Sequence, residues 1–171
     1  MMSEKMQGAM NEQINAELYS SYLYLAMSSY FTSINLMGMA NWMRVQTQEE
    51  LFHAIKMYDF VNERGGRAIM KTIAQPPADW GSALAVFANG LAHEQKVTGL
   101  INNLLDLAMA ERDHATSIFL QWFVTEQVEE EANASGIVNK LRMIGQDASS
   151  LFALDQELGQ RVFTLPTPGA A

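Results

Sequence analysis

The sequence predicts an all-α fold: a four-helix bundle with a long connection between its second and third helices and a short fifth helix. Residues 1–75 contain no proline, and the four prolines lie at positions 76, 77, 166 and 168, which leaves room for long uninterrupted helices. Apolar residues recur every three or four positions, as in helices that pack at shallow angles. These observations predict helices over about residues 5–32, 36–63, 81–110, 113–144 and 147–158.

The lengths of the connections predict the topology. The first and second helices are joined by a few residues, as are the third and fourth, so each pair should be antiparallel. The second connection has about 16 residues and reaches roughly 53–58 Å when extended, whereas a helix of about 28 residues is roughly 42 Å long. This connection can therefore cross the length of the bundle and leave the second and third helices parallel.

Each predicted inward face carries one ionisable residue among its apolar side chains: Glu17, Glu50, Glu94 and Glu130. Counted from the nearest turns at about 1.5 Å per residue, the depths of these four residues differ by only a few ångströms. We therefore expect four carboxylates to meet in one layer in the middle of the bundle. For the third helix, the predicted inward face consists of Leu84, Phe87, Leu91, Glu94, Thr98, Ile101, Leu105 and Ala108.

A layer of buried carboxylates needs compensation, because like charges repel and desolvation costs many kcal/mol unless protons or cations bind. His53 follows Glu50 by three residues, so the imidazole and the carboxylate share one helical face. This Glu-x-x-His pattern is the signature of di-iron and di-manganese carboxylate bundles. Together with the other inward glutamates, it favours a metal centre over polar side chains that only satisfy one another.

Composition restricts the chemistry further. The net charge of −8 argues against a nucleic-acid partner, and the absence of cysteine excludes disulfides, thiolate zinc sites and iron–sulfur clusters. Any metal must then be held by carboxylate, imidazole or carbonyl groups, which suit hard or borderline ions. No stretch is typical of a signal peptide or a membrane span. We expect one domain over residues 1–171 in a cytoplasmic protein without a membrane partner.

Several residues remain open to two interpretations. Gln127 could lie in the centre or simply bond a neighbour, and Tyr24 could be an ordinary core aromatic residue. His93 and His114 have no clear ligand partner and are interpreted as surface or interface residues.

A second acidic group lies on the fourth helix, where Glu126, Glu129 and Glu131 accompany Glu130, and Glu49 lies beside Glu50. These side chains could form a solvated acidic face or a further iron site.

At these positions, and over nearly the whole chain, the sequence resembles the bacterial and archaeal non-haem ferritins. The resemblance is strongest over residues 12–17, 49–54 and 121–131. It implies a hollow octahedral homo-oligomer of 24 subunits, in which Fe²⁺ is oxidised by dioxygen or peroxide and stored as ferric oxyhydroxide.

The resemblance also implies roles for individual residues. A first iron would be held by Glu17, Glu50 and His53, and a second by Glu50, Glu94 and Glu130, with Glu50 as the bridge. A third iron would be held by Glu49, Glu126, Glu129 and Glu130. Gln127 would lie beside the centre, and Tyr24 and Trp122 would be close enough to supply electrons.

Three alternatives stay open. Bacterioferritins carry a second Glu-x-x-His on the fourth helix and a haem-binding methionine on the second, but this chain has Gln127 and Glu130 in the first place and Leu51 and Phe52 in the second. We therefore expect no haem. The chain could also be another di-iron carboxylate oxidase, or a structural cage subunit without catalytic activity.

Overall fold

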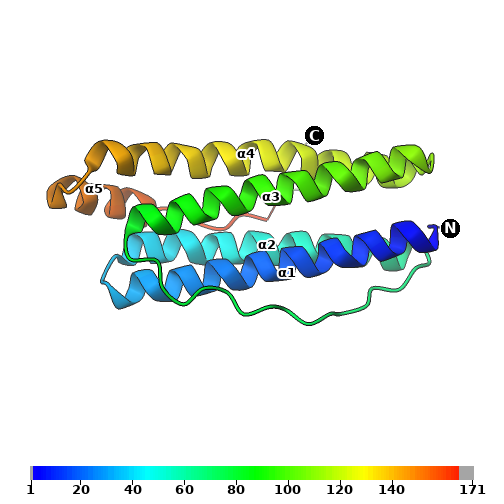
Figure 1. Ribbon diagram of the computed structural model, residues 1–171, viewed down its shortest axis with the longest axis horizontal. Helices are drawn as coiled ribbons and strands as arrows, with labels where there is room; N and C mark the ends of the chain where they lie inside the picture. Colours follow the sequence, from blue (N-terminus) through cyan, green and yellow to red (C-terminus); the bar gives the residue numbers. More distant parts are fainter. Residues whose placement is uncertain (1, 166–171) are drawn as a thin grey trace.

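The structure, a computed structural model, describes residues 2–165 and confirms the predicted all-α fold (Figure 1). Its helices are α1 (Glu4–Ser33), α2 (Met37–Glu63), α3 (Ala83–Ala110), α4 (His114–Ile144) and α5 (Ala148–Leu158). Each end lies within two residues of its predicted position. None of the helices in the described part is both long enough and apolar enough to cross a membrane. The single domain expected over residues 1–171 stays a prediction.

The helices form two antiparallel hairpins, α1 with α2 and α3 with α4 (Figure 1). The connection between α2 and α3 runs along the length of the bundle beside α1, so that α2 and α3 point in the same direction. The crossover predicted from the length of this connection is therefore present.

The short helix α5 is anchored on the start of α2. The N-cap residue of α2, Leu36, makes no side-chain cap, and Asp155 of α5 instead accepts a hydrogen bond from the backbone N–H of Met39 at 2.8 Å. At Gly38, a Cβ atom would lie 1.7 Å from the carbonyl oxygen of Asp155. The absence of a side chain at Gly38 therefore allows the backbones of α2 and α5 to touch.

The apolar core is divided into two parts along the bundle. One part contains Phe31, Met43 and Phe87, and the other contains Met10 and Phe123, together with their neighbours. In all four long helices the inward glutamate lies between the residues of the two parts. The carboxylates therefore occupy a polar layer between two apolar halves.

The predicted inward face of α3 needs a correction. Four of its members are only partly buried: Leu84, Leu91, Thr98 and Leu105. Buried positions that the prediction omitted are Ala83, Val86, Gly90, His93, Val97 and Leu104. The buried face is rotated because α3 packs against α1 as well as α4.

Candidate metal centre

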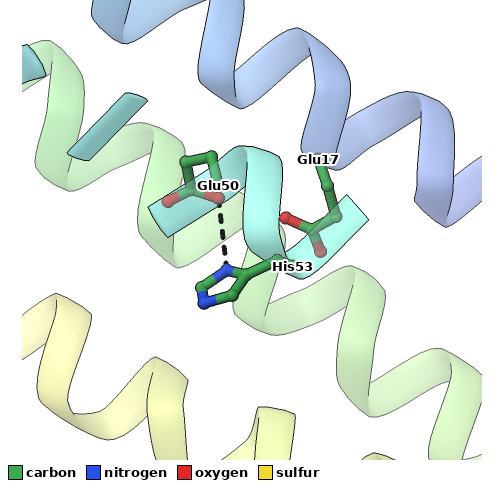
Figure 2. A group of neighbouring side chains, drawn as sticks. All are labelled: Glu17, Glu50 and His53. Carbon is green, nitrogen blue, oxygen red and sulfur yellow. Dashed lines mark ion pairs between the residues drawn. The ribbon is translucent and has the colours of Figure 1, made fainter. Parts of the chain in front are cut away.

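The first hairpin brings together a cluster of three ligand-bearing side chains, Glu17 from α1 with Glu50 and His53 from α2 (Figure 2). All three are buried, and one ligand atom of each lies within 4.8 Å of the others. His53 Nδ1 is 3.5 Å from Glu50 Oε2, because the spacing of three residues places them on one face of α2. Within residues 2–165, no other group of three acidic or histidine side chains meets this distance.

Two buried glutamines hold the carboxylates of this cluster. Gln13 Nε2 donates to Glu17 Oε1 at 2.8 Å. Gln46 Nε2 donates to Glu50 Oε1 at 3.1 Å and to Glu130 Oε2 at 2.7 Å, which links the two hairpins. Neither glutamine was predicted from the sequence. Each precedes its glutamate by four residues on the same helix, and this repeated spacing was the signal available.

The second hairpin contributes Glu94 and Glu130, both buried. The Tyr24 hydroxyl donates to Glu94 Oε1, and Gln127 Nε2 donates to Glu94 Oε2 at 3.3 Å. Tyr24 is therefore in direct contact with the polar layer. Gln127 bonds a neighbour, as one of its two interpretations expected, and that neighbour is one of the four carboxylates.

The electrostatics of the layer show a shortage of positive charge. Burial, followed by the negative charge of Glu50, raises the pKa of Glu17 from 4.5 to about 8. Burial is also the main cause of the raised pKa of Glu50, Glu94 and Glu130, and the neighbouring carboxylates add to it. The layer must therefore bind either protons or cations at neutral pH.

One atom fits a cation particularly well. Glu17 Oε2 is buried and has no hydrogen-bond partner, an unusual state for a carboxylate oxygen. It belongs to the side chain that, with Glu50 and His53, forms the three-ligand cluster. Carboxylate oxygens with one imidazole nitrogen are the donors that iron binds in helical bundles. The residues present therefore fit a divalent iron ion.

The residues expected to bind a third iron are less closely gathered. Glu49 accepts a hydrogen bond from the guanidinium group of Arg161, and Glu126 Oε1 lies 4.0 Å from His53 Nε2. Glu129 is exposed. Burial raises the pKa of both Glu49 and Glu126. Glu126 therefore lies next to the three-ligand cluster, whereas Glu49 is hydrogen-bonded to Arg161.

Aromatic side chains enclose one side of His53. The ring centroids of Trp122 and Phe123 lie 5.4 Å and 5.8 Å from that of the imidazole. Trp122 is thus close to the cluster, as the resemblance implied. The plane of the imidazole is steeply inclined to the planes of both neighbouring rings. These two neighbours limit the orientations that the imidazole can adopt.

His93, which was interpreted as a surface or interface residue, is not on the surface. Its side chain is buried, and its Nε2 atom is 2.7 Å from the hydroxyl oxygen of Ser20 on α1. Burial, followed by the charge of Lys96, lowers the pKa of His93 to about 4, so it is neutral at physiological pH. The packing of α3 against α1 accounts for the difference. His114 is exposed, as expected.

Fold and site together define a crossover four-helix bundle with a buried centre of carboxylates and one imidazole. The chain belongs to the ferritin family, because the family model of the Ferritin-like domain matches residues 7–144. The Bacterial non-heme ferritin of Bacteroides fragilis (strain 638R) is 49% identical over 161 residues, which cover 94% of this chain and 100% of that protein. The Staphylococcus saprophyticus protein of the same name is 40% identical over 163 residues, or 95% of this chain and 98% of the other.

Solved structures agree with this assignment. A closed form of Archaeoglobus fulgidus ferritin, engineered by site-directed mutagenesis, superposes with a TM-score of 0.95 at 58% identity and covers 96% of this chain and 100% of that one. An open-pore ferritin from the same hyperthermophilic archaeon gives a TM-score of 0.94 at 57% identity, with coverage of 95% and 100%.

Proposed function

We propose that this protein stores iron and acts as a ferroxidase, oxidising Fe²⁺ within each subunit and delivering Fe³⁺ to the interior of a cage. The observation that carries this proposal is the buried cluster of Glu17, Glu50 and His53 with its unpartnered carboxylate oxygen. The names of the ferritin relatives support the same function.

In this proposal Fe²⁺ is the substrate, and two ions bind side by side. The first binds at Glu17, Glu50 and His53, and the second is shared between Glu50 and the two glutamates of the other hairpin, Glu94 and Glu130. Binding displaces protons from carboxyl groups whose pKa is raised. Hard carboxylate donors then stabilise Fe³⁺ relative to Fe²⁺ and so favour oxidation.

The electrons balance for either oxidant. Two Fe²⁺ ions give two electrons to dioxygen, which takes up two protons and leaves as hydrogen peroxide. With hydrogen peroxide as the oxidant, two electrons and two protons yield two molecules of water. A centre with a single nitrogen ligand binds the ferric product weakly enough to release it toward a mineral of ferric oxyhydroxide.

Surface composition supports assembly with further copies of the chain. Large apolar side chains are exposed on α1, α2 and the connection that follows α2: Tyr22, Leu25, Leu51, Ile55, Tyr58, Ile69, Met70 and Ile73. On α1 and α2 they recur every three or four residues, so each helix presents them on one face. Apolar patches of this kind mark protein interfaces. We propose that they pair subunits within an octahedral cage of 24 copies in the cytoplasm.

The proposal is tested by adding Fe²⁺ to the metal-free protein without oxygen and then admitting air. We expect two Fe²⁺ to bind tightly per chain, ferric absorbance to appear after air is admitted, and a mineral to sediment with the protein. The Glu50→Gln variant should form Fe³⁺ at least about tenfold more slowly, since even the loss of an outer-shell partner costs about 10–100-fold at metal sites.

Glu63→Gln is the matched control. It removes one carboxylate from an exposed position on the same helix and should oxidise Fe²⁺ at the wild-type rate. Equal rates for Glu50→Gln and Glu63→Gln would show that oxidation does not take place at the proposed centre.

A further inference from the structure

Arg161 reaches the centre from the segment that follows α5. One of its guanidinium nitrogens, Nη1, donates to Gln46 Oε1 at 2.7 Å, and the other, Nη2, donates to Glu49 Oε2. The guanidinium carbon lies 4.4 Å from the centroid of the Trp42 ring, a cation–π contact. The backbone carbonyl of Arg161 accepts a hydrogen bond from Asn41 Nδ2 at 2.9 Å. Backbone and side chain are therefore both fixed in place.

The bond to Gln46 connects Arg161 to the carboxylate layer. A guanidinium group only donates hydrogen bonds, so the atom of Gln46 that faces it must be the amide oxygen. The amide nitrogen of Gln46 must then face the other way, toward Glu50 and Glu130, where it donates to both. Arg161 thereby determines the orientation of a fully buried amide that contacts two proposed iron ligands.

The bond to Glu49 places a positive charge on one of the residues that the resemblance to ferritins assigns to a third iron. The side chains of Arg161 and Glu49 are each 21% exposed, so their attraction is only partly screened by water. Two cations that share one carboxylate repel each other, so the guanidinium group of Arg161 weakens the binding of a metal ion at Glu49.

We propose that Arg161 is a positioning residue that occupies Glu49 until a third iron displaces it, an inference that rests on the proposed iron-binding function. A pocket of about 530 Å³ is lined by Arg161 together with Lys140 and Glu157, which form an ion pair with each other. The displaced guanidinium can turn into this pocket, where the Glu157 carboxylate is exposed. Arg161 thus keeps the third iron weakly bound relative to the first two, which favours its onward transfer.

The test is a calorimetric titration of the metal-free protein with Co²⁺ alone, an ion that binds iron-type ligands without being oxidised by air. Its visible absorption spectrum reports the coordination of each ion that binds. We expect Arg161→Gln to bind the third Co²⁺ about tenfold more tightly than the wild type, as expected for loss of a half-buried ion pair. The affinities of the first two ions should change by less than about twofold. Arg161→Lys keeps the charge but presents one nitrogen in place of the two that Arg161 uses, so its affinity for the third Co²⁺ should lie between those of the wild type and Arg161→Gln.

Two further variants isolate the contact. Arg44→Gln removes the same charge from an exposed position on α2 and should leave the affinity for the third Co²⁺ unchanged. In a Glu49→Gln background, Arg161→Gln should give no gain, because the competing contact is already lost.

The outcomes separate this inference from the proposed function. Wild-type protein that binds fewer than two Co²⁺ per chain would contradict the proposed centre, and the inference with it. Two tight ions, with a third whose affinity is the same in Arg161→Gln and in wild type, would overturn the role of Arg161 alone. If Arg161→Gln does not fold, Arg161→Lys replaces it in the test. An affinity for the third Co²⁺ equal to that of the wild type would then also overturn the role of Arg161.

Discussion

Replacing Glu17 with glutamine removes one buried carboxyl group from the metal-free centre and keeps the volume of the side chain. The raised pKa means that the folded protein holds a proton at Glu17 that the unfolded chain has already lost at neutral pH. The contribution of Glu17 to stability is therefore fully present below pH 4.5 and is lost as the pH rises to about 8. In the Glu17→Gln variant this loss cannot occur.

The size of the effect follows from the two pKa values. Between the unfolded value of 4.5 and a pH of about 7.5, each pH unit costs about 1.4 kcal/mol, or about 4 kcal/mol in total. For a chain of this length, 1 kcal/mol changes the melting temperature by about 2–4 °C. Relative to acidic solution, the melting temperature of the metal-free wild type should thus fall by about 10 °C more than that of Glu17→Gln.

Scanning calorimetry of both proteins in a chelator, at several values between about pH 5 and pH 8, measures this difference. Glu63→Gln is again the control and should follow the wild type. Parallel curves for Glu17→Gln and the wild type would refute the reasoning, because they would show that Glu17 does not titrate across this range. Saturation with Co²⁺ should flatten the wild-type curve, since the cation replaces the protons.

Three further predictions concern α5 and the tyrosine beside the centre. Gly38→Ala should lower stability by about 1–3 kcal/mol in thermal unfolding, because the added methyl group would overlap the carbonyl of Asp155; an unchanged melting temperature would contradict the close contact. Asp155→Ala should cost about 1–2 kcal/mol in the same measurement, since the backbone N–H of Met39 loses its acceptor. Tyr24→Phe should bind two Co²⁺ normally but oxidise Fe²⁺ several-fold more slowly in stopped-flow absorbance, because Glu94 loses a hydrogen-bond donor; a wild-type rate would contradict a role in the reaction.

Much of the fold could be predicted because the proline-free stretches and the lengths of the connections indicate the same topology. Long stretches without proline set the helices, and the length of the connection after α2 set the crossover. The inward face of α3 could not be predicted equally well. Its alternation marks an apolar stripe, but the contact with α1 turns the helix so that His93 is buried against Ser20. Packing between helices that are distant in sequence leaves no signal in the spacing of one helix.

Some residues of the centre could likewise be predicted from the sequence, and others could not. Glu50 and His53 were found because ligand spacing within a helix is fixed by helical geometry. Gln46 was missed because an amide carries no charge and resembles any other polar residue in a sequence. Arg161 could not be found at all, since 112 residues separate it from Glu49 and no periodic pattern joins them. Its position depends on the path of the chain after α5.

The crossover topology has a consequence for how the bundle is put together. Glu17, Glu50 and His53 all lie on the first hairpin, whereas Glu94 and Glu130 lie on the second. Each hairpin is held by contacts between helices that follow one another in the chain, whereas the two hairpins join through contacts between helices that are more distant in sequence and therefore form later. The two sets of carboxylates lose their water at that later step. Docking of the hairpins therefore brings four buried carboxylates together, and protons or cations that offset their negative charge favour this step.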